Sequence, residues 1–271
     1  MNILVCVKQV PNVQTVSVDS STHCLVREGM EGMLNPCDAY ALEAATRLQD
    51  KDKRIKIHVL SMGPPQAEAV LRECLAISAD AAYLATDECF AGSDTLATSQ
   101  ILSACIQKAE ATEGISFDMV FCGQQAMDGG TGHTGPQIAE ALGLPYIGGA
   151  LSCKREGEEL HVLREAEEGK EKVGVTFPCL VSFTKSSFPL RLASIRRKLA
   201  AKKAEIKRMC ADDLEGLPRT SLGLAGASTK VQRTFIPEEK RGGILFAEGS
   251  LEESARRFAH RLMDDGVLRA V

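Results

Sequence analysis

Short apolar runs alternate with amphipathic segments through the first half of the chain. Four apolar runs predict buried strands, at residues 1–10, 55–62, 81–85 and 119–122. Four segments with apolar residues at helical spacing follow them, at residues 35–49, 67–77, 93–109 and 135–142. Helical crossovers of this length join parallel strands. We therefore expect an α/β fold with a Rossmann-like, doubly wound parallel sheet, in which ligands bind at the carboxyl ends of the strands.

Two of the predicted helices have recognisable starts. Asn35 is a candidate N-cap, Pro36 fits the first helical position, and Asp38 places a carboxylate in the first turn. Ser93 is the expected cap of the third helix.

From Leu151 onward the pattern changes to short strands separated by charged turns. We expect strands at residues 160–163, 173–176 and 179–184, which form a β-rich attachment. Residues 156–171 contain seven glutamates, which we interpret as the solvated face of a hairpin. A last amphipathic helix is expected at residues 251–264. We therefore divide the chain into an α/β domain, residues 1–210, and a C-terminal extension, residues 211–271.

The composition is suited to a buried parallel sheet. Hydrophobic residues make up 44% of the 271 positions but aromatic residues only 4%, and Trp is absent, so Val, Ile, Leu and Ala must fill the core. No apolar run approaches the roughly 18 residues that span a bilayer, and the run Ile3–Val7 is too short for a signal-peptide core. We expect a cytoplasmic protein without membrane insertion.

The ten cysteines do not form a recognisable site. They are scattered, mostly within apolar runs, and no C-x₂₋₄-C pair occurs, so the sequence predicts neither a zinc site nor a dithiol redox motif. We expect reduced thiols that pack as small hydrophobes. If the protein handles electrons, a bound cofactor must carry them.

Positive charge is concentrated in residues 185–208. This stretch holds nine Lys or Arg and one acid, a balance of +8, so the rest of the chain carries −12 for a net charge of −4. A solvated face, a nucleic-acid patch and a partner-docking loop all fit such a run. We disfavour nucleic acid, because Phe188 is the only aromatic residue available for stacking.

A glycine-rich segment runs from Gly123 to Gly135, between the fourth strand and its helix. It contains five glycines, and amides exposed by glycine next to a helix N-terminus form a seat for phosphate oxygens. The hydroxyls of Thr131 and Thr134 add donors. The sequence therefore predicts an adenine-nucleotide site here, with a flexible surface loop as the alternative.

This segment is not an ordinary dinucleotide fingerprint. Gly130, Gly132 and Gly135 match G-x-G-x-x-G, but they follow the fourth strand rather than the first, and no ribose-binding acid lies about 20 residues on. His133 has no nucleophile motif or metal ligand beside it, so we expect it to donate to a phosphate or ribose oxygen. Asp94 is either a ligand contact or an acid favoured by its helix dipole. We expect no catalytic side chain and no metal.

Seven short motifs occur in order between residue 1 and about residue 210. They are Val7-Lys8-Gln9-Val10-Pro11, Leu25-Val26-Arg27-Glu28-Gly29, Asn35-Pro36-Cys37-Asp38, Ser61-Met62-Gly63-Pro64, Phe90-Ala91-Gly92-Ser93-Asp94-Thr95, Gln125-Ala126-Met127-Asp128-Gly129 and Ala201-Lys202-Lys203. Together they resemble the β subunit of electron-transfer flavoproteins. The resemblance implies a partner, the α subunit, which holds a redox-active FAD with help from this chain. It also implies that this chain binds AMP, as in simple members, or a second FAD, as in electron-bifurcating members.

The resemblance also implies the residues of the nucleotide site. Matched by position, they are Cys6, Asn35, Pro36, Cys37, Asp38, Met62, Gly123, Gln124, Gln125, Asp128, Gly129, Gly130, Thr131, Gly132, His133 and Thr134. These residues follow the first, second and fourth predicted strands, the same sheet edge that the fold argument indicates.

The basic stretch resembles the family's loop that docks on acyl-CoA dehydrogenases. Its matched residues are Arg191, Ile195, Arg196, Arg197 and Lys198, with Ile195 as the apolar anchor. An aliphatic anchor supplies affinity and the basic residues supply steering towards an acidic partner surface. The C-terminal arm, residues 211–271, would contact the α subunit.

Residues 35–43 and 90–98 resemble the bifurcating group, in which Thr95 and Thr98, next to Asp94, would approach the second flavin. We favour FAD over AMP on this basis. The group oxidises NADH at this FAD and divides the electrons between ferredoxin or flavodoxin and the α-bound FAD, which serves an acyl-CoA dehydrogenase. The glycine-rich segment departs from the group's pattern at Gly130, Gly132, His133 and Thr134. The alternatives are a simple electron-transfer flavoprotein with structural AMP and, more remotely, a stand-alone universal-stress-type module.

Overall fold

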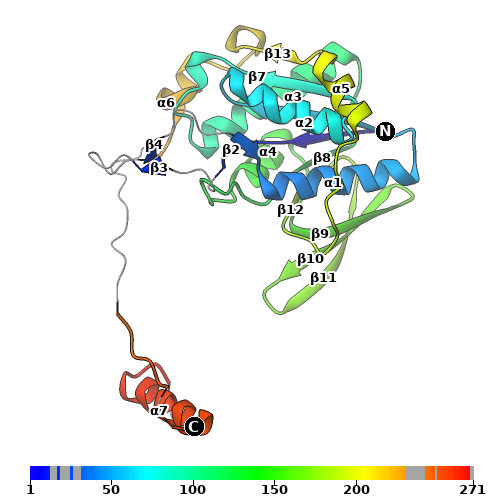
Figure 1. Cartoon of the computed structure of the whole chain (residues 1–271). Coiled ribbons are helices and arrows are strands. Elements are labelled where there is room, and N and C mark those ends of the chain that lie inside the picture. The colour runs from blue at the N-terminus through cyan, green and yellow to red at the C-terminus, as the bar shows by residue number, and fades with distance from the viewer. Residues whose placement is uncertain (13–16, 19–24, 27–31, 230–241, 248, 269–271) are drawn as a thin grey trace. The chain divides into compact units, whose positions relative to one another are not determined.

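A nine-stranded sheet forms the centre of the protein. The computed structural model describes residues 1–12, 17–18, 25–26, 32–229, 242–247 and 249–268. The strands of the sheet are β1 (Asn2–Cys6), β6 (Lys56–Met62), β7 (Ala81–Ala85), β8 (Met119–Gly123), β9 (Tyr146–Glu156), β10 (Glu159–Ala166), β11 (Gly169–Thr176), β12 (Cys179–Phe183) and β13 (Lys207–Met209). Their order is β11-β10-β9-β12-β8-β1-β6-β7-β13 (Figure 1), and all neighbours from β9 to β13 are parallel. The expected α/β fold with a mainly parallel sheet is confirmed.

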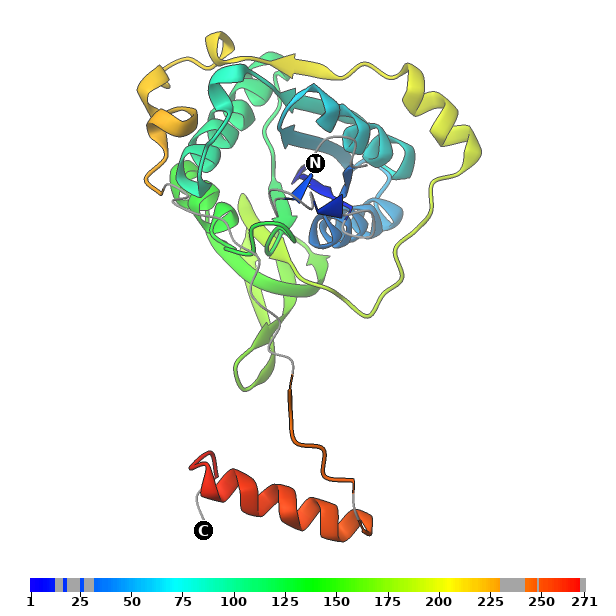
Figure 2. The ribbon, with the colours of Figure 1, turned by 60° about the vertical axis from the view of Figure 1, so that its left-hand side comes forward.

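Helices cover both faces of this sheet. Helices α1 (Pro36–Lys51) and α2 (Glu68–Ile77) lie on one face, and α3 (Thr95–Glu113) and α4 (Thr134–Leu142) lie on the other (Figure 2). Successive residues of β1 serve the two layers alternately. Ile3 and Val5 pack with α1 and α2, whereas Leu4 and Cys6 pack with α3 and α4, and all four are buried. The sheet is therefore doubly wound, as the sequence predicts.

The sheet splits at the carboxyl ends of β1 and β8. The strands β6 and β7 lie on one side of β1, whereas β8 and β12 lie on the other. Pairing of β1 with β8 ends at Val5 and Phe121. However, β1 stays paired with β6 as far as Cys6, and β8 stays paired with β12 as far as Gly123. This edge, where the strand order reverses, is where open α/β sheets bind ligands.

The helix starts agree with the sequence in part. Pro36 is the first residue of α1, as expected, but the side chain of Asn35 makes no capping hydrogen bond. The cap of α3 is Asp94 rather than Ser93, because the Asp94 carboxylate accepts a hydrogen bond from the Ala97 amide. Both neighbouring residues are of capping type, so local sequence does not distinguish them.

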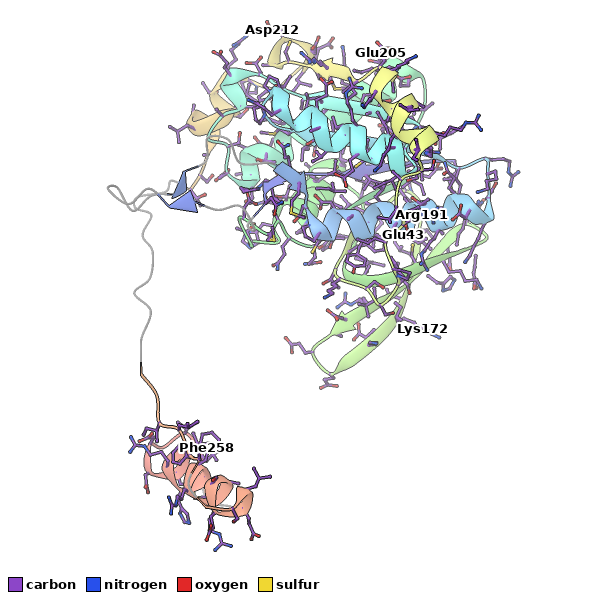
Figure 3. All side chains as sticks on the ribbon, viewed as in Figure 1. Glu43, Lys172, Arg191, Glu205, Asp212 and Phe258 are labelled. Carbon is purple, nitrogen blue, oxygen red and sulfur yellow. The ribbon has the colours of Figure 1, made fainter. Side chains whose placement is uncertain are left out.

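The β-rich attachment is larger than its sequence pattern predicts. Strands β9, β10 and β11 pair antiparallel at one side of the sheet, and Lys172 on β11 lies on this extension in Figure 3. The long strand β9 escapes prediction because Gly148 and Gly149 interrupt its apolar pattern. All seven glutamates of residues 156–171 are exposed, which confirms the solvated face.

Smaller elements surround the sheet. They are β2 (Gln9–Pro11), β3 (Ser17–Val18), β4 (Leu25–Val26), β5 (Gly32–Leu34), η2 (Pro65–Ala67), η3 (Glu88–Phe90), α5 (Ile195–Lys203), η4 (Ala211–Asp213), η5 (Arg219–Ser221) and α6 (Gly223–Gly226). The predicted strand at residues 1–10 is thus two strands, since β2 leaves the main sheet to pair with β5. Residues 27–29 of the second motif lie outside the described residues.

The chain divides into two compact units, Met1–Arg233 and Thr234–Val271. Leu214, Leu222 and Ala227 are buried in the first unit. Residues 211–229 therefore pack with the α/β unit.

The second unit contains the predicted C-terminal helix, α7 (Leu251–Asp264). Ser250 and Glu253 form a capping box at its start, and Phe258 lies edge-on against Phe246 at 5.7 Å between ring centroids. Leu251 and Phe258 remain exposed within this unit. Neither α7 nor any other described helix has the length and apolarity needed to cross a bilayer.

Candidate functional site

Asp38 lies at the split between β1 and β8. Its buried carboxylate projects from the first turn of α1, where Oδ2 accepts a hydrogen bond from the Lys8 amide at 2.7 Å and Oδ1 accepts one from the Gly123 amide at 2.9 Å. Burial raises the pKa of Asp38 to about 7, although these hydrogen bonds oppose the shift. One carboxylate therefore joins the chain just beyond β1 to the last residue of β8.

Asn35 and Lys8 hold the chain beyond β8. The Asn35 side chain donates to the Gln125 carbonyl at 3.0 Å and accepts from the Met127 amide at 3.1 Å. The Lys8 ammonium binds both carboxylate oxygens of Asp128, at 2.8 and 2.9 Å. Asn35, expected to cap α1, instead fixes the start of the glycine-rich segment.

Gln124 fixes the same segment from its other side. The Gln124 amide donates to the Phe183 carbonyl at 2.7 Å. Its side-chain Oε1 accepts from the Gly149 amide at 2.7 Å and from the Ser182 hydroxyl at 2.6 Å. The Tyr146 hydroxyl lies 2.7 Å from that Ser182 oxygen. The first residue after β8 is therefore tied to both β9 and β12.

The middle of the glycine-rich segment is open. Gly130 and Gly132 have φ values of 66° and 69°, in the left-handed region that favours glycine. No described atom lies within 4 Å of a Cβ built at Gly129 or Gly130, and Thr131 and His133 are exposed. Helix α4 follows directly, and the first N–H groups of a helix have no intrahelical partner. The segment thus presents backbone amides in the manner of an anion site.

Cys6, Cys37 and Met62 lie at the same edge. Cys6 and Met62 end β1 and β6, and Cys37 is the second residue of α1. Burial raises the pKa of Cys6 to about 12 and also raises the pKa of Cys37, so both thiols are protonated at neutral pH. The nine cysteines that the structure describes are all free, as expected, and Cys24 lies outside the described residues.

Asp94, Thr95 and Thr98 lie at the start of α3, on the other face of the sheet from α1. Asp94 Oδ1 accepts from the Ala97 amide at 3.0 Å, and Oδ2 accepts from the Thr229 amide and hydroxyl at 2.8 and 3.1 Å. Burial disfavours the ionised form of Asp94, but these hydrogen bonds prevail and lower its pKa. Asp94 is thus a helix cap and a tether, and its contact with a ligand stays a prediction, as do those of Thr95 and Thr98.

Two of the arginines expected to bind a partner point into this chain. Arg191 binds Glu43 and Asp50 on α1, each at 2.8 Å, and Figure 3 shows Arg191 beside Glu43. Arg197 donates to the carbonyls of Leu75 and Ala76 at the end of α2, at 3.0 and 3.1 Å. Both guanidinium groups therefore anchor their own segment. Whether they also contact a partner stays a prediction.

Helix α2 also donates hydrogen bonds to α5. Arg72 on α2 donates to the carbonyls of Ala201 and Lys202 at the end of α5, at 2.7 and 3.2 Å. Each helix thus supplies an arginine that caps the carbonyl end of the other. The exchange fixes the orientation of α5 on α2.

An apolar and basic surface remains outside these anchors. Leu192 is 95% exposed, Ile195 79% and Leu199 59%, with the exposed side chains of Arg196 and Lys198 beside them. We call these five residues the α5 surface.

These features define a doubly wound α/β protein with an open glycine-rich loop at the split edge of its sheet. A family model described as the electron transfer flavoprotein domain matches residues 22–214. An electron transfer flavoprotein subunit beta from Megasphaera elsdenii is 45% identical over 251 residues, which cover 90% of this chain and 91% of the relative. The caffeyl-CoA reductase-Etf complex subunit CarD of Acetobacterium woodii is 38% identical over 268 residues, covering 99% of this chain and 100% of the relative. Protein FixA of Bradyrhizobium diazoefficiens is 36% identical over 267 residues, covering 97% and 90%.

The chain therefore belongs to the electron transfer flavoprotein family, as a β subunit. The resemblance found in the sequence motifs is confirmed. A stand-alone universal-stress-type module is set aside.

Several site residues escape the sequence analysis. Lys8 supplies the ammonium that binds Asp128 of the glycine-rich segment. Its position just beyond the apolar residues of the first strand could have indicated a place at this edge of the sheet. Ser182, Tyr146 and Gly149 support Gln124 from strands far away in the sequence, and no local pattern marks them.

We predict that Gly123→Ala destabilises the fold. A Cβ at this position would overlap Asp38 Oδ1 and lie 2.7 Å from the Cys37 Cβ. We expect the free energy of unfolding, measured by chemical denaturation, to fall by about 2 kcal/mol or more, as overpacking does. Gly129→Ala is the matched control and should change it by less than about 0.5 kcal/mol. Equal losses in the two variants would contradict the close packing at Gly123.

We also predict a pH dependence of stability that Asp38→Asn removes. The folded-state pKa of about 7 exceeds the ordinary value of 3.8, so between these values the folded chain holds a proton that the unfolded chain has released. Rising pH therefore lowers the free energy of unfolding, by roughly 2 kcal/mol between pH 5 and 7.

Denaturation at several pH values measures this slope. Asp38→Asn should flatten it. Asp94→Asn is the control, because the lowered pKa of Asp94 confines its effect to more acidic pH. A slope that survives in Asp38→Asn would show that another group titrates.

Proposed function

We propose that this chain and an α subunit form a cytoplasmic, electron-bifurcating electron transfer flavoprotein, with FAD bound at the split edge of the sheet. The observation that carries this proposal is the glycine-rich segment, whose first residues are fixed and whose middle is open. A rigid, open set of amides at a topological switch point suits the pyrophosphate of a dinucleotide.

The residues present fit such a ligand. The amides of Gly129 and of residues 131–134 would face the pyrophosphate, with the hydroxyls of Thr131 and Thr134 and the imidazole of His133 as further donors, whereas the Gly130 amide donates to the Ala126 carbonyl at 2.8 Å. Asp128 is the one acid between Gly123 and Gly135, and the Lys8 ammonium binds it. The loop therefore offers the phosphates no unpaired negative charge.

One observation favours FAD over AMP. Candidate residues lie at helix starts on both faces of the sheet, Cys37 on α1 and Thr95 and Thr98 on α3, and an extended ligand reaches more of them than a mononucleotide. Separately, the relative CarD is named as a subunit of a caffeyl-CoA reductase complex, which supports a partner that acts on acyl-CoA. Bound FAD would supply the chemistry, accepting hydride from NADH and releasing electrons singly to ferredoxin or flavodoxin and to a second FAD held by the α subunit.

The α5 surface is the proposed contact for an acyl-CoA dehydrogenase. Ile195 and Leu199 are four residues apart and share one face of α5, with Leu192 just before it. Apolar side chains this exposed are unusual on a free surface and are suited to insertion into a partner. Arg196 and Lys198 would steer an acidic partner.

The apolar face of α7 is the proposed contact for the α subunit. Leu251 and Phe258 are seven residues apart, and both are exposed in their own unit. Two turns separate them, so they lie on one side of the helix.

Flavin content tests the cofactor proposal. We expect the purified heterodimer to release two FAD molecules on denaturation and no AMP, as measured by chromatography. One FAD with one AMP would overturn bifurcation and leave a simple electron transfer flavoprotein. Absence of any nucleotide on this chain, with FAD and AMP supplied, would overturn the nucleotide site itself.

Substitution in the α5 surface tests the docking proposal. We expect Ile195→Ala to weaken the apparent affinity for a partner acyl-CoA dehydrogenase about tenfold, as the loss of an anchor residue does. The rate of electron exchange at varied dehydrogenase concentration measures it. Leu224→Ala is the matched control, since Leu224 on α6 is 59% exposed but lies outside the α5 surface. Unchanged exchange in Ile195→Ala would contradict the docking role.

A further inference from the structure

The split of the sheet sends two chain segments in opposite directions. The Val7 amide donates to the Leu60 carbonyl of β6 at 2.8 Å. On the other side, the Gln124 amide donates to the Phe183 carbonyl of β12 at 2.7 Å. Each segment thus stays hydrogen-bonded to the strand on its far side, β6 or β12, whereas β1 and β8 no longer pair with each other.

The amides beside the split need another acceptor. Lys8 and Gly123 are the residues at which the two segments part, and both of their amides donate to the Asp38 carboxylate. Both hydrogen bonds are partly buried, and an N–H shielded from water without an acceptor is costly. The carboxylate therefore takes the place of the missing strand pairing.

The close fit leaves Asp38 little room for a second task. The side chain is 5% exposed, and each of its oxygens already accepts an amide. A Cβ at position 123 would overlap the carboxylate, so glycine is needed opposite it.

We propose that Asp38 is a positioning residue of the nucleotide site, which sets the separation of the Lys8 and Gly123 segments without touching the ligand. The inference rests on the proposed nucleotide site. Asp38 accepts the Lys8 amide on one side of the split and the Gly123 amide on the other, and the Lys8 ammonium also binds Asp128 of the glycine-rich segment. A site whose two segments are held at their working separation before the ligand arrives binds with a smaller ordering cost.

Asp38→Asn in the full-length heterodimer tests this role. The amide is the same size but offers one acceptor atom, so one of the two backbone N–H groups loses its partner. We expect affinity for FAD and for AMP, titrated separately into the nucleotide-free heterodimer, to fall about tenfold or more. Hydrogen exchange at Lys8 and Gly123 should accelerate, while exchange in Leu4 and Val5 stays slow.

Asp118→Asn is the matched control. Asp118 Oδ2 accepts from the Asn2 amide at 2.7 Å, the same kind of bond at the opposite end of β1. We expect this variant to bind both nucleotides within twofold of the wild type. Gly123→Ala displaces the carboxylate from the other side and should reproduce the loss of affinity if Asp38→Asn fails to fold.

The outcomes separate this inference from the proposed function. Wild-type affinity in Asp38→Asn, or an equal loss in Asp118→Asn, would overturn the positioning role while the nucleotide site stands. If the wild type binds neither FAD nor AMP, the proposed function fails. In that case hydrogen exchange alone tests the role of Asp38. Unchanged exchange at Lys8 and Gly123 in Asp38→Asn would show that Asp38 does not hold the two segments.

Discussion

A doubly wound sheet must come apart where its two halves begin. The chain leaves β1 towards β6 and leaves β8 towards β12, so the backbone groups between them lose their pairing at the carboxyl edge. Asp38 accepts the unpaired amides of Lys8 and Gly123 from the first turn of α1, where the positive end of the helix dipole favours a carboxylate. The requirement for glycine at position 123 and the fixed start of the loop both follow from this one arrangement, whereas the elevated pKa of Asp38 comes from its burial.

The basic stretch shows how the same residue type serves two purposes. Arg191 donates hydrogen bonds to Glu43, and Arg197 donates to the carbonyls of α2. Arg196 instead belongs to the exposed α5 surface. Planar guanidinium groups suit this anchoring because several donors can be satisfied at once. A positive charge count for residues 185–208 therefore overstates the charge available to a partner.

The local signals in the sequence were enough to predict β1, β6, β7 and β8, the helix at Pro36, the glycine-rich segment and the family, but not β9 or β13. They were not enough for the bonds that shape the site, because these bonds join residues 85, 90 and 148 positions apart, as in Gly123 to Asp38, Asn35 to Gln125, and Arg191 to Glu43. Asn35 looked like a cap because capping is the common local use of asparagine. A tertiary partner overrode that use, and no window of neighbouring residues contains the partner.

Rigidity and neutrality of the glycine-rich segment depend on each other. Residues 129–134 carry no Asp, Glu, Lys or Arg, so in the proposed site an anion would be held by backbone dipoles together with the side-chain donors of Thr131, His133 and Thr134. A mobile lysine can follow a phosphate, but a dipole is effective only when its orientation is fixed beforehand. Glycine at positions 130 and 132 supplies the turn geometry and no rigidity of its own. The hydrogen bonds that Asp38, Asn35 and Gln124 make at the start of the segment instead fix how it leaves the sheet, so the fixed orientation that the proposed site requires comes from outside the glycines.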